Sequence, residues 1–254
     1  MPPPAGDREV ALVTGAAQGI GAAVARRLAA RGALVAVNDI APRPELDELA
    51  AELGGITAPA DVSDAGQVRA MIAAVEQAAG PVATLVCNAA YMTMGPLTGH
   101  PAPDWWKVVD TNLTGTFHLI QAALPGMRAR GGGRIVVVTS YWGVTGWPGA
   151  TAYAASKAGL IALVKTLGRE LAPEVIVNGI APGVTATPQL AVDAADAGVS
   201  VAEIQQRYAR GVPLGRIGRP DEIAAAVAFL ADPAVGAMTG QILQVNGGEI
   251  RCRA

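Results

Sequence analysis

The sequence predicts an α/β fold, in which one doubly wound parallel sheet of about seven strands is covered by helices on both faces. Short β-branched segments alternate with segments of helical length along the whole chain. Several of the short segments are apolar without interruption, as expected for strands buried on both sides. This alternation indicates βαβ units, whose right-handed crossovers build a parallel sheet.

The elements follow in order. Strands are predicted at residues 10–14, 34–39, 55–60, 83–88, 134–140, 175–180 and 242–245. Helices are predicted at 20–31, 64–79, 104–128, 151–171 and 220–230. Because the sequence contains neither an internal repeat nor a low-complexity linker, residues 1–254 are expected to form one domain.

Two segments do not fit the alternation of strands and helices. Residues 90–103 are rich in glycine and proline, and an insert at about 188–213 contains a helical pattern from 201 to 210. Both follow the carboxyl end of a predicted strand, where ligands bind in open α/β sheets. We expect both segments to form walls of a substrate site.

Composition excludes several classes of function. The net charge of −2 provides no basic surface for nucleic acid or an anionic membrane. No apolar stretch reaches the roughly 18 residues that span a bilayer, and the first residues lack the apolar core of a signal peptide, so the cytoplasm is expected. Cys87 and Cys252, with His100 and His118, are too few and too dispersed to predict a disulfide or a metal site.

A glycine-rich turn, Thr14 to Gly21, directly follows the first strand and opens a helix. Gly15 can adopt the angles of a tight turn, Gly19 lets a pyrophosphate approach the main chain, and Gly21 allows close packing of helix on strand. The helix N-terminus offers free N–H groups and a partial positive charge. The pattern predicts a Rossmann-type dinucleotide site.

Asp39 ends the second strand and predicts NAD as the cofactor. A carboxylate there accepts hydrogen bonds from the ribose hydroxyls and repels a 2′-phosphate. The turn contains no Arg or Lys that could bind the 2′-phosphate of NADP. Arg43 is the cation nearest to Asp39 in the sequence, and its presence weakens the prediction of NAD.

Tyr153 and Lys157 lie four residues apart in a helical pattern and therefore share a face. An ammonium group beside a phenol lowers the phenol pKa, so the pair suits proton transfer to or from an alcohol oxygen. Ser140, at the end of the fifth strand, is expected to hydrogen-bond and orient that oxygen.

With the spacing Gly-x-x-x-Gly-x-Gly and the segment Tyr153-Ala-Ala-Ser-Lys157 in register, the chain resembles the short-chain dehydrogenase/reductase family from residue 10 to residue 248. The resemblance implies four catalytic residues: Asn112, Ser140, Tyr153 and Lys157. In the family's pattern Asn112 interrupts its helix and holds a water beside Lys157. Ala90 departs from the pattern, since the family usually has glycine there.

The turn, Asp39 and the resemblance together imply a set of cofactor-binding residues: Gly15, Gln18, Gly19, Ile20, Gly21, Asp39, Asp61, Val62, Asn88, Ala89, Tyr153, Lys157, Pro182, Gly183, Thr185 and Thr187. Expected substrate residues are the apolar and aromatic side chains of the loops: Tyr91, Trp142, Trp147, Leu190 and Tyr208. No metal is expected.

The expected function is an NAD-dependent oxidoreductase that interconverts a hydrophobic, ring-bearing secondary alcohol and its ketone, running as an oxidation in the cell. Three alternatives stay open: an NADPH-dependent 3-oxoacyl or polyketide ketoreductase, a non-catalytic NAD-binding protein, and an epimerase or dehydratase that retains NAD. The resemblance also implies a homotetramer in which the helices 104–128 and 151–171 pack across a two-fold axis. Their apolar residues serve either that interface or the sheet: Phe117, Ile120, Leu160, Leu163 and Val164.

Overall fold

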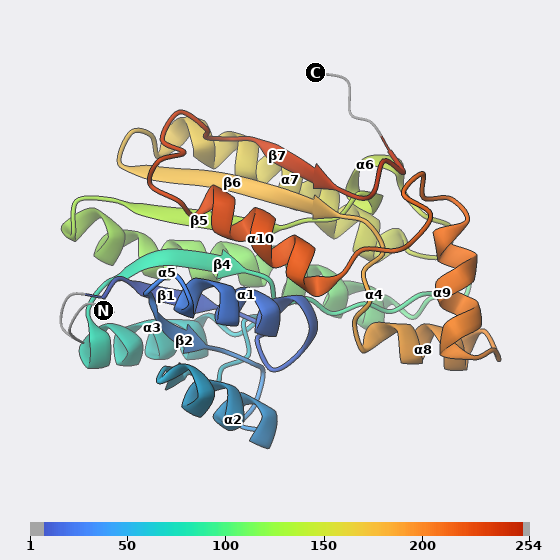
Figure 1. Ribbon diagram of the computed structural model, residues 1–254, viewed down its shortest axis with the longest axis horizontal. Helices are drawn as coiled ribbons and strands as arrows, with labels where there is room; N and C mark the ends of the chain where they lie inside the picture. The colour runs from blue at the N-terminus through green and yellow to red at the C-terminus, as the bar shows by residue number, and fades with distance from the viewer. Residues whose placement is uncertain (1–7, 251–254) are drawn as a thin grey trace.

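The computed structural model describes residues 8–250, so Arg251 and Cys252 lie outside the described residues (Figure 1). Its centre is one parallel sheet in the order β3-β2-β1-β4-β5-β6-β7. The strands are β1 (Val10–Val13), β2 (Leu34–Val37), β3 (Ile56–Thr57), β4 (Val82–Cys87), β5 (Gly133–Val138), β6 (Val175–Pro182) and β7 (Ile242–Val245). The predicted doubly wound α/β fold is confirmed.

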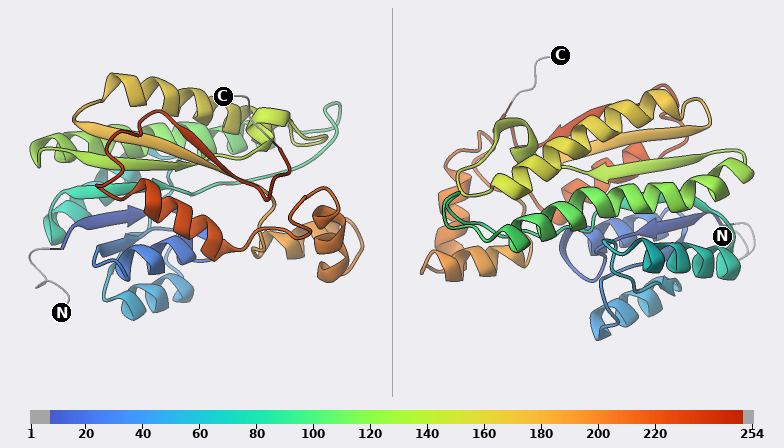
Figure 2. Two further views of the ribbon diagram at one scale, coloured as in Figure 1. Left: turned by 45° about the horizontal axis from the view of Figure 1, so that its top comes forward. Right: turned by 180° about the vertical axis from the view of Figure 1, so that it is seen from behind.

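Helices cover both faces of the sheet (Figures 1 and 2). One face carries α1 (Gly19–Ala29), α2 (Pro44–Leu53) and α10 (Pro220–Leu230), and the other carries α3 (Ala65–Ala79), α5 (Gly115–Ala129) and α7 (Thr151–Glu170). A separate cluster of buried apolar side chains fills each interface between helices and sheet. Burial on both faces explains why the strand sequences are apolar without alternation.

Several elements differ from the sequence prediction. The third strand keeps only Ile56 and Thr57. Beyond them the amide of Asn38 donates to the carbonyls of Ala58 (2.9 Å) and Ala60 (3.1 Å), which holds this segment beside the end of β2. Helices α2, α6 (Trp142–Thr145) and α8 (Gln189–Asp196) form where no helix is predicted. Both ends of α2 carry clear local signals, with Pro44 in the first turn and Gly54 in a left-handed conformation after the last turn.

The helix predicted over 104–128 is not continuous. It divides into α4 (Ala102–Val109), a π-helical turn η1 (Asp110–Thr114) and α5. Single π turns inside α-helices commonly mark functional sites. Asn112 is fully buried in this turn, so the structure contains the interruption that the resemblance implies.

The insert at 188–213 folds into α8 and α9 (Val201–Ala209), which lie at the end of the molecule toward which the strand arrows point (Figure 1). A small apolar cluster of its own, including Leu190, Ala194, Ile204 and Ile217, joins the two helices. The insert therefore covers the carboxyl edge of the sheet as a compact unit.

The apolar residues named for a subunit interface divide between the two roles. Ile120, Leu160 and Val164 are buried against the sheet, and Leu163 is partly buried there. Phe117 is 48% exposed. Three of the five residues therefore belong to the core of the subunit. Among residues 8–250, no helix combines the length and the apolar character needed to cross a bilayer.

Candidate active site

A cavity of about 610 Å³ opens at the carboxyl edge of the sheet, where the chain turns away from β1 and β4 in opposite directions. Such a switch point is the expected ligand site of an open α/β sheet. The walls of the cavity come from the ends of β1, β2, β4, β5 and β6 and from the insert of α8 and α9. Its volume lies within the roughly 300–1,000 Å³ typical of small-molecule sites.

The glycine-rich turn after β1 requires its glycines. Gly15 and Gly19 have φ angles of 62° and 58°, which side-chain-bearing residues rarely adopt. A Cβ atom on Gly15 would lie 2.9 Å from the Cα of Ala89, and one on Gly21 would overlap the Gly15 carbonyl oxygen. Gly15 and Gly19 line the cavity, whereas Gly21 lies behind it and serves the packing of the turn.

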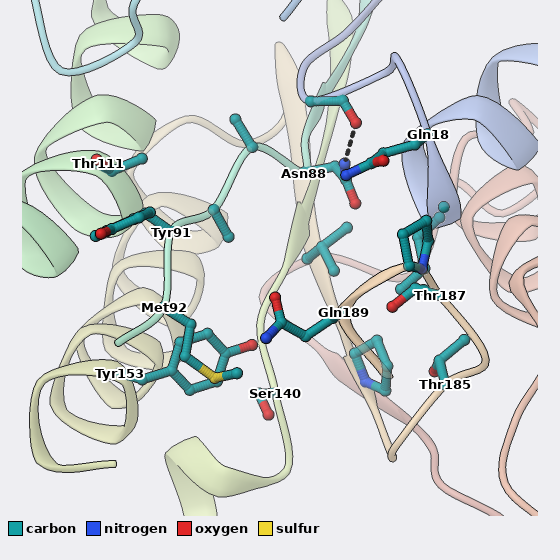
Figure 3. A pocket seen from close by; sticks show the side chains of 18 of the residues that line it. Gln18, Asn88, Tyr91, Met92, Thr111, Ser140, Tyr153, Thr185, Thr187 and Gln189 are labelled. Atoms are coloured by element: carbon teal, nitrogen blue, oxygen red, sulfur yellow. Dashed lines mark hydrogen bonds between the residues drawn. The ribbon is translucent and has the colours of Figure 1, made fainter. Parts of the chain in front are cut away.

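Thr14 and Asn88 hold this turn against the end of β4. The Thr14 hydroxyl accepts hydrogen bonds from the backbone N–H groups of Asn88 (3.1 Å) and Ala89 (3.0 Å). The Asn88 amide donates to the carbonyl oxygens of Thr14 (2.9 Å) and Gly15 (3.1 Å) (Figure 3). The rigid cradle thus leaves the main chain of the turn open to the cavity, which fits a dinucleotide pyrophosphate.

Asp39 closes the β2 side of the cavity. One carboxylate oxygen accepts from the N–H of Ala17 at 3.3 Å and the other from the N–H of Ile40 at 2.9 Å. The Arg43 guanidinium lies 3.5 Å from the second oxygen. The carboxylate is therefore turned toward the glycine-rich turn, as expected for a group that meets a ribose.

The other expected cofactor residues also come together. The cavity wall contains Gln18, Ile20, Asp61, Val62, Asn88, Ala89, Pro182, Gly183, Thr185 and Thr187. It also contains Ala90, the residue at which the family usually has glycine. These residues come from the ends of four separate strands, β1, β3, β4 and β6. The residues present therefore fit the nicotinamide dinucleotide that the turn predicts.

Tyr153 and Lys157 from α7 and Ser140 from the end of β5 all line the cavity. Figure 3 shows the side chains of Tyr153 and Ser140 near each other. The Lys157 ammonium donates to the Val138 carbonyl at 2.8 Å and lies 5.4 Å from the centre of the Tyr153 ring. Lys157 is 2% exposed. The backbone N–H of Trp142 donates to the Ser140 hydroxyl at 3.1 Å, which fixes that hydroxyl.

Burial governs the acidity of this pair. Desolvation raises the pKa of Tyr153 to about 12, and the hydroxyl of Ser140 acts in the opposite direction. Desolvation lowers the pKa of Lys157 to about 8. The structure therefore departs from the expectation that Lys157 brings the phenol pKa toward neutrality, because desolvation of the buried phenol raises that pKa. Tyr153 is a protonated acid at neutral pH.

Asn112 supports the site from behind the cavity wall. Its side chain accepts from the Tyr91 N–H at 2.8 Å and donates to the Tyr91 carbonyl at 3.1 Å. It also donates to the Ser156 hydroxyl at 3.0 Å, and Ser156 donates to the Tyr153 carbonyl at 2.8 Å. Asn112 thus connects the loop after β4 to the helix that carries Tyr153 and Lys157. Its water-holding role stays a prediction.

Four of the five expected substrate residues line the cavity: Tyr91, Trp142, Leu190 and Tyr208. Trp147 is the exception. Its ring stacks on Trp142, with the ring centres 4.9 Å apart and the planes within 10°, and it does not line the cavity. Trp142 in turn meets the Tyr153 ring edge to face at 5.8 Å. Trp147 therefore supports the wall that Trp142 forms.

The cavity wall also contains polar residues that the sequence pattern does not single out, among them Lys107, Thr111, Gln189 and Asp193. Gln189 and Asp193 are four residues apart on α8, and the Gln189 amide donates to the Asp193 carboxylate at 3.0 Å. Helical spacing is the one signal that could have paired them, but the sequence predicts no helix over 188–196.

Comparison with known proteins gives consistent matches over nearly the whole chain. A family model described as enoyl-(acyl carrier protein) reductase matches residues 15–249. The chain is 39% identical to nodulation protein G of Azospirillum brasilense, covering 95% of this chain and 98% of that protein. It is 37% identical to the 3-oxoacyl-[acyl-carrier-protein] reductase FabG of Thermotoga maritima, covering 94% and 97%.

Two solved structures are also similar. A variant of actinorhodin polyketide ketoreductase with NADPH has a TM-score of 0.91 at 38% identity, covering 96% of this chain and 97% of that chain. The ligand-free aldohexose dehydrogenase of Thermoplasma acidophilum has a TM-score of 0.89 at 29% identity, covering 95% and 94%.

Proposed function

This chain belongs to the short-chain dehydrogenase/reductase family, and from that premise we propose that it reduces the ketone of a 3-oxoacyl thioester to a hydroxyl group. It is an oxidoreductase whose cavity suits a nicotinamide cofactor. Relatives named as 3-oxoacyl or polyketide ketoreductases support a thioester ketone better than the hydrophobic cyclic alcohol expected from the sequence. The proposed direction, reduction, is also opposite to the expected oxidation.

One observation supports this reaction most strongly: Tyr153 and Ser140 lie together in the cavity wall, and burial, which raises the Tyr153 pKa to about 12, keeps the phenolic proton available for a ketone oxygen. When bound, the nicotinamide supplies the hydride that reduces the ketone carbon. Tyr153 donates its phenolic proton to the ketone oxygen, and the Ser140 hydroxyl donates a hydrogen bond to the same oxygen. Lys157, 5.4 Å from the Tyr153 ring, stabilises the phenolate that remains. The phenolate then recovers its proton from solvent.

The test is to mix the purified protein with acetoacetyl-CoA and NADH or NADPH, and to follow the loss of absorbance of the reduced cofactor. Cyclohexanone, tested in the same way, and cyclohexanol, tested with NAD⁺ or NADP⁺ by the gain of that absorbance, are the comparison substrates. We expect acetoacetyl-CoA to be reduced with the highest kcat/KM. Turnover of the cyclic compounds without turnover of acetoacetyl-CoA would restore the hydrophobic-alcohol function instead.

For the cofactor we propose a preference for NADH over NADPH. The Asp39 carboxylate faces the glycine-rich turn, where a 2′-phosphate would meet its negative charge. NADPH is the second candidate, since the similar ketoreductase was solved with NADPH. The Arg43 guanidinium, 3.5 Å from Asp39, is the cation that would favour it.

Asp39→Ala is expected to lower kcat/KM with NADH by about 10- to 100-fold, because a carboxylate hydrogen bond contributes roughly 1.5–3 kcal/mol. The same change is expected to raise kcat/KM with NADPH by removing the repulsion. Steady-state kinetics with both cofactors measure the two effects, and Asp47→Ala on α2 is the matched control. Equal use of NADPH and NADH by the unmodified protein would contradict the preference.

We also propose the homotetramer that the family resemblance implies. Exposed Phe117 on α5 and exposed Trp106 on α4 support an interface on this side of the subunit. Light scattering of the purified protein gives the assembly mass, and a monomer would reject the proposal. The cytoplasmic location stays a prediction.

A further inference from the structure

The α8 side of the cavity presents one amide to the reaction centre. Gln189 is the first residue of α8, and its side chain extends into the cavity toward the wall that carries Tyr153 and Ser140 (Figure 3). Much of the surrounding wall is apolar, including Met92, Trp142 and Leu190. A polar group in such a wall selects the substrate atom that lies opposite it.

Hydrogen bonds fix the orientation of this amide. The Gln189 nitrogen donates to one oxygen of Asp193 at 3.0 Å, and the Tyr208 hydroxyl donates to the other at 3.1 Å. A carboxylate only accepts, so Asp193 determines which end of the Gln189 amide is the NH₂ group. Tyr208 comes from α9, so the carboxylate also joins the two helices of the insert.

The bond to Asp193 uses one of the two N–H groups of Gln189. Within residues 8–250 the second N–H has no protein partner. Ser140 and Tyr153 already provide two donors for the ketone oxygen. A second carbonyl two atoms away, as in a 3-oxoacyl thioester, would lack a donor if the wall opposite were wholly apolar, and an unpaired carbonyl costs binding energy.

We propose that Gln189 is a specificity-determining residue whose free N–H donates to the thioester carbonyl of a 1,3-dicarbonyl substrate. Asp193 is its positioning residue, held in turn by Tyr208. This inference rests on the proposed function and deepens it, since it names the feature that separates a 3-oxoacyl thioester from a simple ketone.

The test compares two substrates that differ only at that carbonyl. One is acetoacetyl-CoA, and the other is the thioether formed when the thiol of coenzyme A adds to methyl vinyl ketone, which has CH₂ in place of the thioester carbonyl. The specificity ratio is the kcat/KM of the first divided by that of the second. Gln189→Leu is expected to lower this ratio about 10-fold, the equivalent of one hydrogen bond to a neutral group. Gln206→Leu on α9 is the matched control.

A double-mutant cycle tests whether Asp193 positions Gln189. Asp193→Ala is expected to lower the same ratio severalfold through KM rather than kcat. Because Asp193 acts through Gln189, the double variant with Gln189→Leu is expected to be no worse than Gln189→Leu alone. Independent, multiplying losses would overturn the positioning role.

A binding measurement separates this inference from the proposed function. Trp142 lines the cavity, so quenching of tryptophan fluorescence by acetoacetyl-CoA in the presence of NAD reports binding without turnover. If the unmodified protein reduces acetoacetyl-CoA but Gln189→Leu leaves the ratio unchanged, only the inference fails. If the unmodified protein binds acetoacetyl-CoA without reducing it, the proposed function fails. The inference is then decided by affinity: it holds if Gln189→Leu weakens the binding of acetoacetyl-CoA more than the binding of the thioether. If the unmodified protein neither binds nor reduces acetoacetyl-CoA, both fail. Equal losses for both ligands would assign Gln189 to cavity shape and overturn the inference.

Discussion

Tyr153→Phe is expected to lower kcat for ketone reduction by about 10²–10⁴-fold, the usual contribution of a positioned general acid. The change removes the phenolic proton and leaves the aromatic ring, so the contact with Trp142 is retained. Single-turnover kinetics under saturating cofactor measure the chemical step. Activity within a few-fold of the unmodified protein would reject the catalytic role of Tyr153.

The same residue predicts a pH dependence. Because burial raises the pKa of Tyr153 to about 12, the acid is present throughout the neutral range. Reduction is therefore expected to be nearly independent of pH between pH 6 and 8. Oxidation of the alcohol needs the phenolate and is expected to rise with pH over the same range. A reduction rate that rises with pH, together with an oxidation rate that falls with pH, would show that another group carries the proton. Cofactor binding, measured by calorimetry, is the control for an intact site.

Lys157→Met is expected to abolish most of the activity and, unlike most active-site changes, to increase stability near neutral pH. The ammonium is buried and its pKa falls from 10.5 to about 8. Between these values the unfolded chain binds a proton that the folded chain does not, so the contribution of Lys157 to the free energy of unfolding rises with pH. Below pH 8 both states are protonated and the full penalty applies. This penalty is on the order of 3 kcal/mol.

Urea unfolding of both proteins at pH 7 and pH 10 measures this effect. The stability of the Met variant relative to the unmodified protein is expected to fall as the pH rises, by a large part of that amount. Costs that do not depend on pH, such as the lost bond to the Val138 carbonyl, cancel in this comparison. A stability difference that is the same at both pH values would show that Lys157 is not destabilising as a buried charge.

Local patterns could predict most of the fold. Uninterrupted apolar strands and the glycines of the first turn follow from burial on two faces and from backbone angles, which are properties of short segments. The division of the long helix at Asn112 follows from the family resemblance. Helix α8 could not be predicted with the same ease, because its apolar residues pack on α9 rather than on the sheet. The sequence pattern shows the period of an element but not the partner that covers it.

The sequence by itself determined the α/β class and the glycine-rich turn, because each depends on the pattern of a few neighbouring residues. It also predicted the candidate catalytic residues, through the spacing of Tyr153 and Lys157 and through the family resemblance. Only the tertiary structure decided that Trp147 lies behind Trp142, that Gln189 reaches the cavity, and that Tyr153 is a protonated acid. The physical reason is that burial, electrostatic environment and orientation depend on residues far away in the chain. The acidity of Tyr153 is the clearest case: its spacing from Lys157 predicts a lowered pKa, but the packing around the phenol raises it.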